Sequence, residues 1–279
     1  MKMARSTYYQ HLQNQPSPQE TRDRELKAAI EKVRFTFPGY GHRKLYHHFL
    51  REGKRINRKR IRRVTRKYGL YPVVWKSFKI QTTQSDHNLP VFPNLLRGVR
   101  VTGLNQAWVA DITYIAILSG FVYLAAILDL FSRKVIGWAI SRRLDHEFTM
   151  VALRMALQER KPPTGCIHHS DRGIQYACWD YVELLQGQGL MVSMSRTGNP
   201  YDNAFAESFF KTLKYEEVHL FNYETYEDVL ERIPNFIEEV YNRKRLHSSI
   251  GYLPPEEFEK EVADKASSQI AVRPILCSE

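Results

Sequence analysis

Residues 107–140 have the sequence AWVADITYIAILSGFVYLAAILDLFSRKVIGWAI, which is the most informative stretch of the chain about its fold. It is rich in Val, Ile, Tyr and Trp, and turn residues interrupt it at Ser119-Gly120 and Ser132-Arg133. Apolar and β-branched runs bounded by such turns are typical of β-strands. The pattern therefore predicts three consecutive strands, at Trp108–Ala116, Phe121–Leu128 and Lys134–Ile140.

Helices and strands alternate after this stretch. An amphipathic helix should follow Asp145, a residue suited to the N-cap, with its inward face formed by Phe148, Val151, Ala152, Met155 and Ala156. The remaining pattern predicts strands at Cys166–Ser170 and Leu190–Met194, and helices at Trp179–Leu185, 202–218 and 225–244. This order, within the α/β class, is that of a ribonuclease-H-like fold, a five-stranded mixed sheet with flanking helices. A generic mixed α/β domain is the alternative.

Charge divides the 279-residue chain unevenly. Residues 1–100 hold 23 Lys and Arg against 6 Asp and Glu, a net charge of +17. The remainder has a net charge of −6, so the whole chain has a net charge of +11. A strongly basic segment favours a nucleic-acid partner, although a solvated basic face would give the same count. The sequence has no apolar run of membrane-spanning length and only three cysteines, so we expect a cytoplasmic protein with no membrane contact and no disulfide framework.

The basic segment also shows helical periodicity. Apolar stripes at Leu26–Phe37 and Leu45–Leu50 precede a third expected helix that begins after Asn57, a good N-cap. Three short helices with a basic third helix is the layout of a helix-turn-helix, whose last helix enters the DNA major groove. We expect phosphate contacts from the arginines of that helix, namely Arg58, Arg60, Arg62, Arg63 and Arg66.

Three acidic residues occupy distinctive places in the α/β order. Asp111 lies within the otherwise apolar first strand, Asp171 just after the fourth strand, and Glu207 in the helix after the fifth. Such a sheet can bring them to one edge, where three carboxylates would suit Mg²⁺ ions and in-line phosphoryl displacement. By itself, however, a triplet drawn from the 24 acidic residues of this region can arise by chance, and each carboxylate could simply be solvated.

The helix that carries Glu207 has two predicted faces. Asn203, Glu207 and Lys214 share one face, and we expect Lys214 to bind a DNA phosphate, with an ordinary surface lysine as the alternative. A second set falls together elsewhere and should anchor the helix to the core, namely Phe205, Phe209 and Leu213.

Several motifs resemble those of one family. They are RSTYY (5–9), YGHRKL (40–45), INRKRIRRV (56–64), FPNLL (92–96), NQAW (105–108), WxxDITY (108–114), HSDRGxQY (169–176), GNPYDNAxxESFF (198–210), YNxxRxHS (241–248) and GYLPPEEF (251–258). Together they resemble the second-reading-frame transposase of the IS-three family of bacterial insertion sequences, of the DDE retroviral-integrase type. The 35 residues between Asp171 and Glu207 are the spacing typical of that superfamily.

The resemblance implies roles for individual residues. Asp111, Asp171 and Glu207 would be the catalytic, metal-binding acids for two Mg²⁺ ions, with Mn²⁺ as a substitute, and the family's basic residue falls on Lys214. Asn203, Arg243, Arg245 and His247 would add DNA contacts, and Trp108 and His169 would support the site. An ordinary buried histidine is an equal alternative for His169. Zinc at Cys166, His168 and His169 is disfavoured because strand alternation separates neighbouring side chains.

It also implies a domain plan: an N-terminal segment (1–20), a helix-turn-helix (21–72), a linker (73–100), an integrase catalytic core with C-terminal helices (101–262) and a flexible tail (263–279).

The implied function is DNA transposition. The protein would bind the terminal inverted repeats, cleave a strand and join the freed 3′-hydroxyl to target DNA, as a homo-multimer associated with the bacterial nucleoid. An upstream-frame protein or a frameshift fusion is a further expected partner. The alternatives are a catalytically inactive DNA-binding regulator or element remnant, and a ribonuclease-H-like nuclease without strand transfer.

Overall fold

The computed structural model describes residues 16–72, 89–196 and 203–271, without the side chains of 266 and 268–271. The chain divides into two compact units, residues 1–74 and 75–279. The expected N-terminal segment up to residue 15, linker residues 73–88, the loop at 197–202 and the tail from 272 lie outside the described residues. In the part of the chain that is described, no helix has the length and apolar character needed to cross a membrane.

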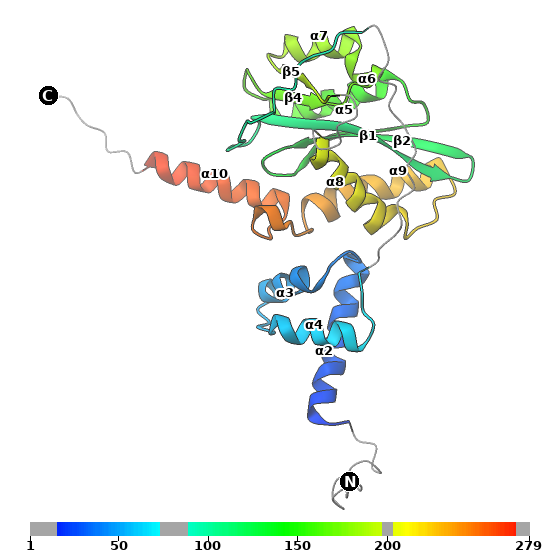
Figure 1. Ribbon diagram of the computed structural model, residues 1–279, viewed down its shortest axis with the longest axis vertical. Coiled ribbons are helices and arrows are strands. Elements are labelled where there is room, and N and C mark those ends of the chain that lie inside the picture. The colour runs from blue at the N-terminus through cyan, green and yellow to red at the C-terminus, as the bar shows by residue number, and fades with distance from the viewer. Residues whose placement is uncertain (1–15, 73–88, 197–202, 272–279) are drawn as a thin grey trace, which may run out of the picture. The chain divides into compact units, whose positions relative to one another are not determined.

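The first unit is a three-helix domain formed by α2 (Pro18–Thr36), α3 (His42–Arg51) and α4 (Arg58–Lys67) (Figure 1). Its core contains the fully buried side chains of Ile30, Tyr40, Leu45, Phe49, Ile61 and Val64. The predicted cap of the third helix is confirmed, because Asn57 accepts a hydrogen bond from the Lys59 N–H at 2.8 Å. Leu50, the last residue of the second apolar stripe, lies near the end of α3 and is 43% exposed.

The second unit is built on a five-stranded mixed sheet, as the sequence predicted, and its strand order is β3-β2-β1-β4-β5. β1 (Ala107–Ile117), β2 (Gly120–Asp129) and β3 (Val135–Ser141) form an antiparallel meander. β4 (Ile167–Ser170) and β5 (Met191–Met194) continue the sheet in parallel with β1. This topology places the middle of β1 beside the end of β4, which are the two predicted positions of catalytic aspartates.

Helices cover both faces of this sheet (Figure 1). Side chains of β1 alternate, so that Trp108 and Ala110 pack in one core with α5 (His146–Arg160), α6 (Ile174–Ala177) and α7 (Trp179–Gly187). Ala107 and Val109 pack in the opposite core with α8 (Ala204–Leu213), α9 (Tyr226–Asn235) and η3 (Phe236–Asn242). The sheet therefore has one face covered by α5, α6 and α7 and an opposite face covered by α8, α9 and η3.

Helix α5 confirms one prediction and corrects another. Asp145 caps it, accepting from the Phe148 N–H at 3.3 Å, as expected. α5 packs so closely on β3 that a Cβ on Gly137 would lie 2.3 Å from the Ala152 carbonyl oxygen. Val151, predicted to face inward, is 56% exposed because it lies on the helix side opposite Ala152 and Ala156.

The C-terminal region contains wider helical turns than the 3.6-residue pattern predicts. α8 continues into a π-helical turn, η2 (Lys214–Val218), and α9 continues into the π-helical η3. A short 3-10 turn, η4 (Ser248–Ile250), then leads to α10 (Pro255–Ala271).

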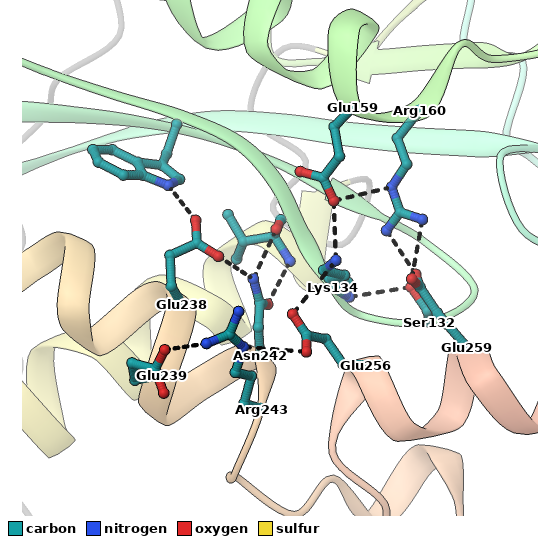
Figure 2. A network of polar contacts seen from close by, with 12 residues as sticks. Ser132, Lys134, Glu159, Arg160, Glu238, Glu239, Asn242, Arg243, Glu256 and Glu259 are labelled. Carbon is teal, nitrogen blue, oxygen red and sulfur yellow. Dashed lines mark hydrogen bonds and ion pairs between the residues drawn. The ribbon is translucent and has the colours of Figure 1, made fainter.

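Helix α10 is held to the rest of the unit by polar contacts (Figure 2). Arg160 of α5 donates to Glu259 at 3.0 and 2.7 Å, and Lys134 lies between Glu159 and Glu256. The helix runs to Ala271, so the start of the expected flexible tail is helical. An i,i+4 ion pair between Glu261 and Lys265 supports this extension.

The described part of the expected linker belongs to the second unit. Leu89 and Phe92 pack against one core of the sheet, and Leu96 packs against the other. The Leu95 N–H donates to the Ser193 hydroxyl oxygen at 2.9 Å. The FPNLL motif therefore lies along the edge formed by β5, where it covers a strand edge that would otherwise be open.

Candidate active site

Asp111 lies at the middle of β1, opposite Ala126 of β2. Its carboxylate accepts a hydrogen bond from the Ile112 N–H at 2.8 Å. Burial raises the pKa of Asp111 well above its ordinary value, and the nearby charges of Asp171 and Glu207 raise it further. The Lys214 ammonium acts in the opposite direction. Asp171, Glu207 and Lys214, which the sequence singled out together with Asp111, therefore all lie within electrostatic reach of Asp111.

Asp171 follows the last residue of β4 and begins a tight turn. Its Oδ1 accepts from the Gly173 N–H at 2.9 Å, so the side chain is fixed by its own turn. A Cβ at position 173 would lie 3.0 Å from that oxygen, closer than such contacts normally come. The glycine of the HSDRG motif is thus explained by the close approach of the carboxylate to the backbone.

Glu207 lies on the exposed side of α8, whose other side buries Ala206, Phe209 and Leu213. Asn203, immediately before the helix, is buried and donates from Nδ2 to the Ala110 carbonyl oxygen at 3.1 Å. This contact ties the start of α8 to the strand position next to Asp111. Asn203, for which the resemblance implied a DNA contact, thus contacts the protein backbone in this structure.

The prediction that Phe205 anchors α8 in the core is wrong. Its side chain is 43% exposed, and the Arg133 guanidinium stacks over its ring at 3.8 Å. A cation–π contact with a residue from the β2–β3 turn has replaced core burial.

A groove of about 1430 Å³ runs between β1 on one side and α8 and η2 on the other. Asp111, Glu207 and Lys214 line it, as does the exposed Lys211. The Lys214 Nζ lies 4.3 Å from the centroid of the Tyr114 ring. Burial lowers the pKa of Lys214, and the negative charge of Asp111 opposes that shift. The groove is thus lined by three acidic residues, Asp111, Glu207 and Glu224, and by two lysines, Lys211 and Lys214.

The donor chemistry of this groove fits Mg²⁺, which takes carboxylate oxygens and retains waters. A bound cation would also offset the mutual repulsion that raises the pKa of Asp111. In the described parts of the chain, no three His, Cys, Asp or Glu side chains are arranged closely enough to hold one ion. The fold therefore brings Asp111 and Glu207 to one groove, with Asp171 near enough to influence Asp111, without assembling the acids into a closed cage.

The residues expected to support the site are fully buried. The His169 ring lies between the hydroxyls of Ser193 and Ser195, at 2.8 and 3.0 Å. Trp108 donates from Nε1 to the Asn105 side chain at 3.2 Å. His168 points to the opposite face, where its Nε2 is 3.0 Å from the Tyr181 hydroxyl, as strand alternation predicted.

Tyr176 is a neighbour of the acids that the sequence did not single out. Its side chain is 2% exposed, and its hydroxyl has no hydrogen-bond partner among the described residues. Burial raises its pKa, and the charges of Tyr181, Asp111 and Asp171 add to that shift. It appears in the sequence only as the last letter of HSDRGxQY, five residues after Asp171, and that spacing was the available clue.

The cations of the C-terminal signature do not line the groove. Arg245 is buried and forms a bidentate ion pair with Glu216. Arg243 is exposed and pairs with Glu239 and Glu256 (Figure 2). His247 is buried, with its ring against Tyr241. In this structure the three residues expected to contact DNA contact the protein itself.

The arginines of α4 fall into two groups. Arg58, Arg62 and Arg66 are exposed at four-residue spacing and therefore form a stripe along one side of the helix. Burial lowers the pKa of His42, and the positive charges of this stripe lower it further.

Arg63 and Arg60 face the helix partner. Arg63 donates through both terminal nitrogens to the buried carboxylate of Asp23 on α2, each at 2.7 Å. Arg60 donates to the Arg22 carbonyl oxygen at 2.8 Å. These two cations hold α4 to α2, whereas the stripe remains at the surface.

Comparison with known proteins gives the same two-part organisation. Residues 20–77 match the HTH-like domain family, and residues 102–200 and 188–255 match two profiles of the integrase core domain. The chain is 39% identical over 267 residues to the insertion element IS600 uncharacterized 31 kDa protein of Shigella sonnei, covering 95% of this chain and 98% of that protein.

A second transposase and a solved integrase structure are also similar to this chain. Transposase InsF for insertion sequence IS3A of Escherichia coli K12 is 40% identical over 223 residues, which cover 80% of this chain and 77% of that protein. The catalytic core domain of BIV integrase is 18% identical with a TM-score of 0.44, covering 58% of this chain and 99% of that chain. The resemblance found in the sequence is confirmed: the chain belongs to the family of insertion-sequence transposases in which an HTH-like domain precedes an integrase core.

Proposed function

We propose that this transposase binds the terminal inverted repeats of its element and catalyses Mg²⁺-dependent strand cleavage followed by 3′-hydroxyl strand transfer. The observation that carries the proposal is the groove lined by Asp111, Glu207 and Lys214, together with Asp171, whose charge lies near enough to raise the pKa of Asp111. Acids at the middle of β1, after β4 and on α8 match the DDE arrangement that the sequence resemblance implies.

Asp111, Asp171 and Glu207 would hold two Mg²⁺ ions, or Mn²⁺ in their place. When bound, these ions supply activation of the attacking oxygen and stabilisation of the leaving oxygen in an in-line displacement. The turn at Gly173 orients Asp171, and Asn203 fixes the start of the Glu207 helix against β1. Lys214 binds a phosphate of the element end next to the acids, where Tyr114 supports its side chain.

DNA binding is shared between the two units. The exposed stripe of Arg58, Arg62 and Arg66 contacts phosphates and positions the HTH-like domain on the terminal repeat. Strand transfer requires two ends and a target in one complex, so the active form is a homo-multimer assembled on DNA. An upstream-frame protein, or a frameshift fusion to it, is a further proposed partner.

The test is a cleavage and joining assay with end-labelled element DNA and a supercoiled target in Mg²⁺. The proposal predicts nicking at the element end and a joined product, and loss of both in Asp111→Asn with end binding retained. Binding without cleavage would indicate an inactive regulator, and cleavage without joining would indicate a nuclease. Either result contradicts the proposal.

A further inference from the structure

The C-terminal signature YNxxRxHS packs behind the helix that carries Glu207 and Lys214. The ring of Tyr241 meets Phe209 of α8 edge-on, with 4.8 Å between centroids, and Phe209 lies two residues after Glu207. Asn242 exchanges two hydrogen bonds with the Val135 backbone of β3, at 3.0 and 2.9 Å. The segment is thus fixed to the sheet on one side and to α8 on the other.

Arg245 extends this contact to the end of α8. Its Nε and Nη2 donate to the two carboxylate oxygens of Glu216, at 2.7 and 2.8 Å, and the side chains are 9% and 6% exposed. A buried bidentate arginine–carboxylate pair has defined geometry, and removal of one partner leaves an uncompensated buried charge. Glu216 therefore has little freedom to move while Arg245 is present.

Glu216 lies in the π-helical turn η2, which begins at Lys214. The His219 N–H donates to the Lys214 carbonyl oxygen at 2.9 Å, a step of five residues that widens the turn. Glu216 and Glu217 are both buried, while Lys214 faces the groove above Tyr114. Fixing Glu216 therefore fixes the backbone turn from which the Lys214 side chain projects.

We propose that Arg245 is a positioning residue: through Glu216 it holds η2 so that Lys214 stays above Tyr114 and within reach of Asp111. This differs from the direct DNA contact that the sequence suggested for Arg245. The importance of Lys214 to catalysis rests on the proposed function, but its placement by Arg245 is a property of the protein alone and is measured without DNA.

The first experiment measures acetylation of Lys214 by mass spectrometry in the full chain, relative to Lys211, an exposed lysine of the same helix. Loss of the pair frees η2, so Arg245→Gln and Glu216→Gln should each raise the Lys214 to Lys211 labelling ratio several-fold. Should Arg245→Gln fail to fold, Glu216→Gln carries the test, because it breaks the same pair from the other side. An unchanged ratio in a folded variant overturns the proposal.

The matched control is Arg160→Gln. Arg160 and Glu259 also form a bidentate pair with side chains only 10% and 13% exposed, but they join α5 to α10 and do not touch η2 (Figure 2). The control should leave the labelling ratio at the wild-type value. An equal rise in this variant would show that the effect is general destabilisation and would overturn the proposal.

Binding to element-end DNA separates positioning from direct contact. If Arg245 touched DNA, Glu216→Gln would leave binding unchanged or strengthen it, because a negative charge is removed. Positioning predicts instead that Glu216→Gln weakens binding as Arg245→Gln does, and that neither change adds to the loss in a Lys214→Ala background. Additive losses contradict the proposal. Failure of wild-type cleavage would refute the proposed function, whereas the labelling ratio would still decide the role of Arg245.

Discussion

DNA contacts were expected both from the arginines of α4 and from Arg245 of the C-terminal signature, but these residues differ in environment. Arg58, Arg62 and Arg66 are exposed, and among the described residues none of them forms an ion pair. Arg245 is buried against Glu216. The role of a cation in this protein therefore depends on whether the fold buries a carboxylate beside it. Arg63 illustrates the rule within α4, because Asp23 removes it from the exposed stripe.

The largest loss of activity is expected from substitution of the candidate catalytic acids, which belong to neither group of arginines. Asp171→Asn or Glu207→Gln should reduce strand cleavage to background, because each removes a charged metal ligand, while binding to end DNA persists. Gel-shift and cleavage assays on the same preparations measure both quantities. Cleavage at the wild-type rate by either variant would remove that residue from the active site.

Arg245→Ala tests the buried side of the comparison. It should lower the free energy of unfolding by about 3–5 kcal/mol, because Glu216 is left buried without its partner. Arg62→Ala, at an exposed position, should change it by no more than about 0.5 kcal/mol. Urea denaturation measures both. If both variants changed the free energy of unfolding by the same small amount, the Arg245–Glu216 pair would add little to stability, and the buried and exposed arginines would not differ in this respect.

Arg62→Ala tests the exposed side. Loss of one phosphate contact should weaken binding to element-end DNA. The plot of log binding constant against log salt concentration should become less steep, by about 0.9 in slope. Arg160→Ala, which breaks an internal pair, is the control and should leave the slope unchanged. The assay is a salt titration of DNA binding, and an unaltered slope for Arg62→Ala would exclude that residue as a phosphate ligand.

Arg63→Ala tests the ion pair that α4 forms with Asp23, through the pH dependence of stability. Hydrogen bonds from Arg63 hold the pKa of Asp23 below its ordinary value of 3.8. A lowered carboxyl pKa contributes stability that is present above the unfolded pKa and is lost as pH falls through the folded value. The wild type should therefore lose stability below about pH 4 more steeply than Arg63→Ala. Urea midpoints between pH 5 and 2 measure this.

Arg66→Ala is the control for the pH experiment, since Arg66 belongs to the exposed stripe and makes no pair with Asp23. Its pH dependence should match that of the wild type. Identical curves for Arg63→Ala and wild type would contradict the assigned pairing.

Much of the fold was predictable because it depends on local pattern. Apolar runs and two short turns predicted the β1–β3 meander, and the N-caps Asn57 and Asp145 are both confirmed. The order of strands and helices predicted that such a sheet can bring the three acids to one edge. In the structure Asp111 and Glu207 line one groove, and Asp171 lies near enough to raise the pKa of Asp111.

What the sequence did not predict depends on partners distant along the chain. Arg245 is buried because Glu216, 29 residues earlier, meets it in space. Phe205 stays outside the core because Arg133 covers its ring. A 3.6-residue pattern also does not predict the π-helical turn that begins at Lys214, in which the consecutive residues Glu216 and Glu217 are both buried. Periodicity identifies which residues share a helix face, but not what that face meets.

The central claim is that Asp111, with Asp171 and Glu207, forms a metal-dependent active site. Its most direct test is single-turnover cleavage of end-labelled element DNA across a Mg²⁺ titration, for the wild type and Asp111→Asn with matched DNA occupancy. The account predicts a wild-type rate that rises with Mg²⁺ and disappears on chelation, and a variant rate at background throughout. A wild-type rate independent of metal, or an Asp111→Asn rate equal to it, would contradict the claim.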